Sequence, residues 1–483
     1  MPFILGANSA SDTVYSIDQS IRFDDNSEHY MYSPTPSSSK NFTTTATISM
    51  WIKLADIGQH YFAGAFYNSN ARYELIQINA NNKLSANGRS GGASTATGSG
   101  VTKWTTTQVF RDPSAWYHLV FVYDTTNSIQ SERFRLYVNG ARVTDFDTNP
   151  SYGASELVYW FGKSSYFTLG AYFNNTGYAD SFYWDGYMAE VHGIDGTALD
   201  ASNFGEYNSS NIWIPKEYTG SHGTDGFYIK GADANALGTD SSDNGNNFTL
   251  NGINPHDKMA DSPTNNFPTL NSLNKYGSNV SLSDGNLTST VSSTSNERGA
   301  KATQAVTSGK WYFEVYFSAS NADNNGGVAV SGSSESNDVP GETTDPTGFR
   351  YMSAGNFRQN GSSTGVITTI AAKDIVMVAI DMDNDKAWFG INGTWVSSGD
   401  PAAGTNATTT TLPDLAFPAS YHYSTTATEL FNFGQDSTFS GLYTQSNSYV
   451  ADSNNYVGAS DGNGVGSFFY TPPTGYLAIC TKP

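Results

Sequence analysis

The chain has 483 residues, 14% of them charged and 14% aromatic, and a formal net charge of −20 at pH 7. An acidic surface repels phosphate backbones, so no nucleic-acid binding through a basic face is expected. No run of residues approaches the ~20 apolar positions of a membrane-spanning helix, so no membrane insertion is expected either. The single cysteine, Cys480, excludes an intrachain disulfide.

The composition indicates an all-β protein of more than one domain. The chain contains 30 Tyr, 28 Phe and 47 Gly but only 24 Lys and Arg together. Aromatic residues favour half-buried strands, glycines favour the turns between them, and long helices need more Lys and Arg. A chain of this length is also too long for one core. We expect two antiparallel β-sandwiches, or jelly-rolls, in tandem, joined by a partly structured connector.

The first block, residues 1–207, is predicted to form one sandwich because short runs alternate between apolar and polar residues. The clearest predicted strands are 20–24, 47–53 and 116–123. Residues 134–143 predict a hairpin with Asn139-Gly140 at its turn, a pair that accepts the positive φ of a type I′ turn. The Asn-, Ser-, Gly- and Thr-rich stretch 79–100 is expected to be a surface loop, and 197–206 a short helix.

Residues 208–270 are expected to form the connector, because prolines and a turn-rich stretch at 240–247 interrupt its two short predicted strands. These strands are 226–230 and 248–250. The second sandwich is expected at 271–440. A C-terminal tail, 441–483, is expected to dock on it.

The second sandwich has its own strand signals. Residues 310–317 alternate cleanly between the two faces, and 374–381 read as a buried strand. Residues 386–393 close a second hairpin at Asn392-Gly393.

The first block resembles the laminin-G-like, concanavalin A-like jelly-roll family. The matching segments are Ile21–Asp24, Ile48–Lys53, Trp116–Asp124, Leu136–Gly140, Trp184–Val191, Leu199 and Ser202–Phe204. Ala189 stands where many members of that family carry Asp, so a role for that carboxylate does not transfer to this chain. The resemblance implies a sandwich of two antiparallel sheets.

The third block resembles the SPRY family, another bent antiparallel sandwich. The matching segments are Ser308–Val315, Lys373–Asp383, Trp388–Gly393, Phe417–Ala419 and Leu430–Gln435. The tandem, with 261–266 between the blocks and 472–476 near the end, is similar to proteins of bacteriophages of aquatic bacteria. There the arrangement is read as a tail-fibre, receptor-binding or capsid-surface component. Both folds host many functions, so the resemblance implies a fold more firmly than a role.

The sequence contains patterns that resemble catalytic sites, but each also has a structural explanation. A glycan hydrolase needs two carboxylates facing each other across the sugar. Asp381, Asp383 and Asp385 have the spacing, but Asp383-Asn384-Asp385 also reads as the turn of a hairpin, which we favour. Two G-x-S-x-G matches, at 361–365 and 458–462, lack the following helix that a nucleophile elbow requires. No catalytic residue is predicted.

One stretch suggests a metal site. Asp240, Asp243 and Asn246 place oxygen ligands around Gly245, which suits Ca²⁺. The same residues are good turn formers, and the turn interpretation is favoured. No cofactor other than calcium is expected.

One predicted loop has the composition of a sugar site. Tyr172, Asn174, Asn175 and Tyr178 combine aromatic faces with amide hydrogen-bonding groups. The alternative is that the aromatic rings only cover the end of the sandwich, and this alternative is favoured.

These observations lead to a functional hypothesis. We expect a non-enzymatic phage virion surface protein, a tail fibre or receptor-binding adhesin that recognises host cell-surface glycan or protein. A capsid or tail decoration protein and a glycan hydrolase are the alternatives. The expected partners are other virion proteins, host glycan or protein and, as an open possibility, further copies of the chain. Residues 1–7 are too short for a signal-peptide core, so assembly in the host cytoplasm and a place on the virion surface are expected.

Overall fold

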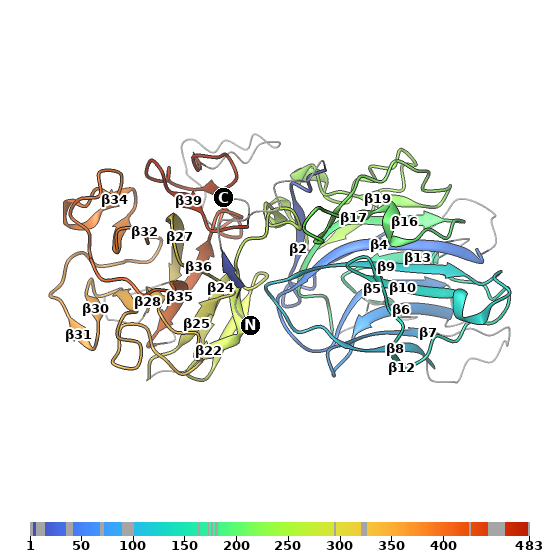
Figure 1. The fold of residues 1–483 in the computed structure, drawn as a ribbon, viewed down its shortest axis with the longest axis horizontal. Helices are drawn as coiled ribbons and strands as arrows, with labels where there is room; N and C mark the ends of the chain where they lie inside the picture. Colours follow the sequence, from blue (N-terminus) through green and yellow to red (C-terminus); the bar gives the residue numbers. More distant parts are fainter. Residues whose placement is uncertain are drawn as a thin grey trace. The chain divides into compact units, whose positions relative to one another are not determined.

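The structure is a computed structural model that describes residues 3–5, 15–34, 42–67, 72–88, 101–161, 165–171, 173–174, 177–178, 182–293, 296–319, 326–424, 427–442 and 459–481. The chain folds into two compact units. The N-terminal unit comprises 12–258 and 262–264, and the C-terminal unit comprises 1–11, 259–261 and 265–483. Figure 1 labels many of their strands, which are numbered in chain order.

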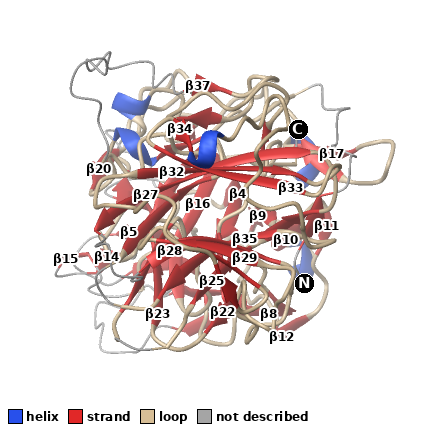
Figure 2. Ribbon diagram, turned by 90° about the vertical axis from the view of Figure 1, so that its left-hand side faces the viewer, coloured by secondary structure: helices blue, strands red, loops and turns tan. Residues whose placement is uncertain are grey.

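Strands make up the regular structure of both units, and the described helical segments are short 3₁₀ turns (Figure 2). These turns are η1 (Gln130–Glu132), η2 (Ala201–Asn203), η3 (Ala234–Ala236), η4 (Pro255–Asp257) and η5 (Val396–Ser398). The predicted all-β class is confirmed. The helix expected at 197–206 is reduced to the single turn η2. No helix in the described ranges has the length and apolarity to cross a bilayer.

The first sheet of the N-terminal unit has the order β11-β10-β9-β4-β16-β2, and β19 also pairs with β16. Its strands are β2 (Ser20–Phe23), β4 (Thr45–Leu54), β9 (Trp116–Asp124), β10 (Phe134–Val138), β11 (Ala141–Arg142), β16 (Gly186–Asp195) and β19 (Phe227–Ile229). β4 lies between β9 and β16 and pairs antiparallel with both, as an apolar central strand should.

The second sheet of this unit has the order β12-β8-β7-β6-β5-β13-β3-β20. Its strands are β3 (Tyr30–Tyr32), β5 (His60–Tyr67), β6 (Arg72–Ile78), β7 (Lys83–Gly88), β8 (Val101–Val109), β12 (Phe146–Thr148), β13 (Ser165–Leu169) and β20 (Thr249–Asn251).

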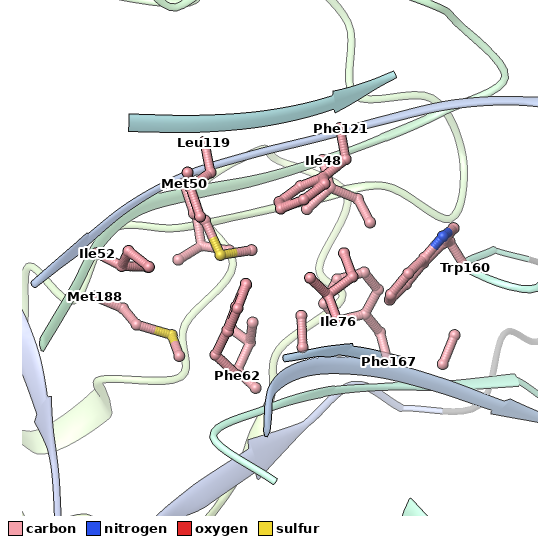
Figure 3. Close-up of a cluster of buried hydrophobic side chains, with 14 of the residues drawn as sticks. Ile48, Met50, Ile52, Phe62, Ile76, Leu119, Phe121, Trp160, Phe167 and Met188 are labelled. Atoms are coloured by element: carbon pink, nitrogen blue, oxygen red, sulfur yellow. The ribbon is translucent and has the colours of Figure 1, made fainter. Parts of the chain in front are cut away.

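One large core fills the space between these two sheets. Figure 3 shows Met50 and Phe121 of the first sheet pointing toward Phe62, Ile76 and Phe167 of the second. Successive side chains of a strand point to opposite faces, so Ser49 and Trp51 lie on the other face of β4. The N-terminal unit is therefore a β-sandwich whose first sheet has a second covered face.

The prediction of a surface loop at 79–100 is wrong for the first part of this range, because Lys83–Gly88 form β7 between β6 and β8. Leu84 and Ala86 point into the core, and the residues that alternate with them, Ser85 and Asn87, are small and polar. The strand is held by its two neighbours rather than by its own apolar content. Residues 89–100 lie outside the described residues.

The segment expected as a connector is divided between the units. Residues 208–258 belong to the N-terminal unit, where β19 extends the first sheet and β20 the second. Phe227, Ile229 and Phe248 are buried in the core between the sheets. The chain leaves the unit at β21 (Lys258–Met259).

The C-terminal unit contains a sheet of order β22-β25-β35-β28-β29-β30-β31. Its strands are β22 (Leu270–Tyr276), β25 (Gly299–Ala302), β28 (Gly326–Ser331), β29 (Phe349–Met352), β30 (Phe357–Gln359), β31 (Ser362–Ser363) and β35 (Phe417–His422). Beside it, β1 (Phe3–Leu5) runs parallel to β26 (Gln304–Val306).

The other sheet of this unit has the order β23-β24-β36-β27-β32-β33-β34. Its strands are β23 (Val280–Ser283), β24 (Thr288–Val291), β27 (Lys310–Ala319), β32 (Ile375–Asp381), β33 (Lys386–Ile391), β34 (Thr394–Trp395) and β36 (Thr428–Asn432). β39 (Leu477–Ala478) pairs parallel with β27, and β37 (Ala459–Ser460) pairs with β38 (Ser467–Phe468). Residues 459–481 thus fold onto this unit.

Both predicted Asn-Gly turns are present. Asn139 and Gly140 have φ of 48° and 77°, and Asn392 and Gly393 have φ of 49° and 81°. Positive φ at both central residues is what a type I′ turn requires, and it is costly for most other residues. These two hairpins could be predicted from the sequence to the residue.

Candidate functional site

A surface hairpin covers the outer face of the first sheet in the N-terminal unit. Here η2 leads into β17 (Gly205–Tyr207), which pairs antiparallel with β18 (Trp213–Pro215). The Asp200 side chain caps η2 by accepting the backbone N–H of Ser202. A small apolar cluster that includes Val120 and Phe204 lies beneath the hairpin.

Trp213 is the anchor of this hairpin. Its indole Nε1 donates to Nδ1 of His118 at 3.0 Å, and its ring lies 4.9 Å from that of Tyr207. A Cβ at Gly140 would lie 2.3 Å from Trp213 Cε3, and one at Gly205 would lie 2.4 Å from Cζ2. The indole therefore lies close to two glycines that are distant in sequence.

His118 holds Trp213 as a neutral imidazole. Because the indole can only donate, His118 Nδ1 accepts, and the ring proton sits on Nε2, which contacts Ser49 Oγ at 2.9 Å. Burial, with a smaller contribution from His192, lowers the pKa of His118 to about 3. Trp51 stacks on the imidazole at 4.6 Å between ring centroids. The anchor therefore does not change its charge near neutral pH.

An open pocket of about 390 Å³ lies beside this anchor. Its lining combines three aromatic rings with two carboxylates and one ammonium, from Tyr137, Tyr207, Trp213, Asp200, Glu206 and Lys216. Tyr207 is 50% exposed, and Glu206 is also exposed. The volume falls within the range of small-ligand pockets, roughly 300–1,000 Å³. Aromatic faces and charged hydrogen-bonding groups that meet in one concavity suit a polar ligand with an apolar face.

The sequence did not point to this pocket. An aromatic residue on each side of the polar stretch 208–211 is a signal for a hairpin with a ring on each strand. The boundary expected at 207 separated Tyr207 from Trp213 and hid that signal. The contribution of Tyr137 depends on the fold alone.

A buried polar cluster lies on the same face of the sheet. Glu190 accepts hydrogen bonds from the hydroxyls of Tyr15 and Tyr228, and His192 Nε2 lies 3.6 Å from its carboxylate. Burial raises the pKa of Glu190, but His192 and the two tyrosines outweigh it and leave the pKa lowered. His192 Nδ1 in turn contacts His222 Nε2 at 3.1 Å. No room for a water molecule remains beside Glu190, so this cluster is packing rather than a site.

The predicted sugar-binding loop is described only in part. Tyr172 and Asn175 lie outside the described residues, while Asn174 ends β14 (Phe173–Asn174) and Tyr178 ends β15 (Gly177–Tyr178). The two strands pair antiparallel as a small hairpin. The predicted role of these residues stays a prediction.

The predicted calcium residues build a tight turn. Asp240 is buried, and its carboxylate accepts the backbone N–H groups of Tyr228, Ser242 and Asn246, each at 2.9 Å. The Asn246 side chain donates to Gly226 O at 2.8 Å. Asp243 is exposed with a φ of 67°. These bonds account for the turn, and calcium binding stays a prediction.

A different acidic group is brought together by the fold. Asp24, Asp25 and Asp185 each place one carboxylate oxygen within 4.8 Å of the others. Asp24 and Asp185 are buried, and burial raises the pKa of Asp25. Oxygen ligands of this kind suit Ca²⁺. Sequence reasoning could not pair Asp185 with the other two, because 160 positions separate it from Asp25.

Two arrangements bear on hydrolysis. Ser289, His422 and Glu429 of the C-terminal unit meet, with Ser289 Oγ 2.8 Å and a Glu429 oxygen 3.5 Å from the same His422 nitrogen, Nε2. A catalytic triad places the acid on the other imidazole nitrogen, and His422 and Glu429 are wholly buried. Burial also lowers the pKa of His422 to about 3. This cluster is part of the core.

The spaced acids of the second hairpin belong to its turn. Asp383 and Asp385 lie between β32 and β33, and Asp383 Oδ1 accepts the backbone N–H of Gly309 at 2.8 Å. Asp381 lies at the end of β32 and accepts the backbone N–H of Asn384. This is the geometry expected of turn residues.

Part of the N-terminal unit is similar in sequence to domains of the concanavalin A kind. Residues 25–202 match the family model of the concanavalin A-like lectin/glucanases superfamily. This match covers less than half of the chain, so it identifies the fold of one segment. None of the curated proteins matches the chain.

Solved structures similar to parts of the chain include three of known source. The SPRY domain of human HERC1 is 18% identical, with a TM-score of 0.28, covering 34% of this chain and 96% of that one. A heptameric SAP-like pentraxin from Limulus polyphemus is 15% identical, with a TM-score of 0.28, covering 39% and 80%. A provisionally assigned carbohydrate binding protein from Bacteroides ovatus is 17% identical, with a TM-score of 0.32, covering 50% and 59%.

Proposed function

We propose that this protein is a non-enzymatic adhesin on the surface of a bacteriophage virion, a tail-fibre or receptor-binding component. It recognises glycan or protein on the surface of the host cell. The observation that carries the proposal is an open pocket of aromatic and charged side chains on a lectin-like sandwich. The place on a virion rests on the tandem resemblance alone.

Neither the acids of the second hairpin nor Glu190 offers the pair of carboxyl groups that glycan hydrolysis needs. Glycan hydrolysis needs two carboxyl groups facing each other across the sugar, one of them able to donate a proton. Asp383 lies in a turn, and Glu190 is enclosed by tyrosines and a histidine. Glu206 and Asp200 line the pocket, where they can accept hydrogen bonds from a bound ligand.

Binding of the purified chain to host cells and to immobilised glycans tests the proposal. The expected result is saturable binding to cells or glycans without release of reducing sugar ends. Binding to phage particles, without binding to cells or glycans, would show that the protein is a decoration protein and not an adhesin. Release of reducing sugar ends that increases with protein concentration would show that the protein is a glycan hydrolase.

The location is tested on intact particles. An antibody raised against the purified chain should label phage tails or capsids in electron micrographs. Labelling absent from particles whose proteins include this chain would contradict a surface position.

A further inference from the structure

We infer that the Trp213 pocket, defined by Tyr137, Asp200, Glu206, Tyr207, Trp213 and Lys216, is a carbohydrate subsite for a neutral or amino-bearing pyranose. This inference rests on the proposed function and gives it a location and a ligand class. Glu206, Tyr207, Trp213 and Lys216 lie beyond the segment that matches the lectin family model, whereas Tyr137 and Asp200 lie within it. The pocket is also separate from the loop 172–178 that the sequence suggested.

The aromatic rings provide the platform for a sugar. The rings of Tyr207 and Trp213 meet at 68°, so together they form a corner rather than one flat surface. A pyranose has one apolar face of C–H groups that packs on such rings, while its hydroxyls point outward. Tyr207 is half exposed before any ligand binds, and covering it removes apolar surface from water.

The platform is already in place in the unliganded chain. Trp213 is held by His118, by the Asn139-Gly140 turn and by Gly205, and the Tyr207 hydroxyl donates to Asn139 O at 3.2 Å. Side chains that are fixed before binding lose little conformational entropy when the ligand arrives. A weakly binding sugar benefits most from such preorganisation.

The charges of the lining select among sugars. Asp200 and Glu206 carry two negative charges, and Lys216 carries one positive charge, so the lining has an excess of one negative charge. The Lys216 ammonium donates to Ser202 O at 3.2 Å, which fixes it at the rim. Carboxylates accept hydrogen bonds from hydroxyl and ammonium groups but repel sialic or uronic acid carboxylates. The expected ligand therefore carries no acidic group.

The test uses the full chain and an array of immobilised neutral, amino-bearing, sialylated and uronic acid-containing oligosaccharides, followed by titration with the best binder. Tyr207→Ala removes the exposed ring, and Glu206→Gln removes a carboxylate from an exposed position. Tyr423→Ala is the matched control, because Tyr423 is 46% exposed and lies in the C-terminal unit. Melting curves of all variants check that the fold is intact.

The wild type should bind neutral or amino sugars. Y207A and E206Q should each raise the dissociation constant about tenfold or more, from the loss of ring contact and of a charged hydrogen bond. Y423A should leave it unchanged. This pattern would support the pocket.

Other outcomes overturn the inference and separate it from the proposed function. If both variants still bind glycans as the wild type does, the carbohydrate subsite lies elsewhere, and the proposed adhesin function is unaffected. Cell binding without glycan binding would mean that the adhesin recognises protein. The inferred carbohydrate subsite would then be wrong, while the proposed adhesin function would remain. Binding confined to acidic glycans would overturn the ligand class, and no binding to cells or glycans would remove both proposals.

Discussion

Glu314 shows how a buried carboxylate can attach a distant segment, residues 469–470, to a sheet. It lies on β27, on the face opposite to Phe313, and it is wholly buried. Its carboxylate accepts the hydroxyl of Tyr312, the amide of Asn432 and the backbone N–H groups of Phe469 and Tyr470. The tail expected to dock on the second sandwich is therefore held partly by one side chain.

At pH 5, replacing Glu314 by Gln should lower the free energy of unfolding by about 2 kcal/mol, because an amide nitrogen would then face N–H and O–H donors, whose hydrogen bonds it cannot accept. Denaturant titration of the full chain measures the change. Glu335→Gln is the control, since Glu335 is an exposed carboxylate of the same unit. An equal effect of both substitutions would contradict the role of Glu314.

The same residue predicts a dependence on pH. Burial raises the pKa of Glu314 to about 7, although its four donors partly offset the effect. The folded chain therefore binds this proton more tightly than the unfolded chain, whose Glu titrates near 4.5. The contribution is complete below pH 4.5 and is lost as pH rises to 7. The stability difference between wild type and E314Q should accordingly shrink between pH 5 and pH 8, and a difference that grows over this range would be evidence against it.

At the scale of elements, the two Asn-Gly hairpins are a matched pair that differ in what lies above the glycine. A Cβ at Gly140 would meet the Trp213 ring at 2.3 Å, whereas a Cβ at Gly393 would lie 3.1 Å from the ring of Tyr470. Both glycines have positive φ. An alanine at either position would strain the left-handed backbone to a similar extent, but its methyl group would collide far more severely with a ring at position 140 than at position 393.

Gly393→Ala should therefore cost about 1 kcal/mol, mainly from the left-handed backbone, with a small shift of the Tyr470 ring. Gly140→Ala should cost clearly more, because the indole must also move. Thermal unfolding of the two variants compares them directly. Equal shifts in melting temperature would show that Trp213 does not depend on the absence of a Cβ at position 140.

Elements were predictable where the strand itself carries the signal. β4, β9, β27 and β32 have long apolar or alternating runs, and the sequence placed each of them within a few residues. β7 has no such signal, since its polar and small residues are held by neighbouring strands. The Trp213 pocket has contributions from β10, η2, β17 and β18. No local pattern specifies which of these segments meet, so the site required the structure.

At the scale of the whole molecule, each unit has its own sheets, and the N-terminal unit needs residues beyond the expected boundary at 207. Phe227, Ile229 and Phe248 are buried in its core, and Trp213 packs against the apolar cluster on the outer face of its first sheet. The concanavalin A-like match ends at 202, before any of these residues. The family pattern is thus shorter than the folding unit.

A fragment of residues 12–264 should fold by itself, because it retains both sheets and the full core. A fragment of residues 12–207 should not unfold cooperatively, since it lacks β19 and β20 and exposes apolar surface. Circular dichroism with thermal denaturation distinguishes them. A cooperative transition in the shorter fragment would show that residues 208–258 are an accessory segment.

The close approach of Trp213 to Gly140 and Gly205 has an evolutionary consequence. Any larger side chain at either glycine would displace the indole, and a smaller residue at 213 would leave a void that such a side chain could fill. These three positions should therefore vary together among descendants of this gene. A lineage that lost the tryptophan would lose the steric constraint at both glycines, although the positive φ at position 140 would still favour glycine there.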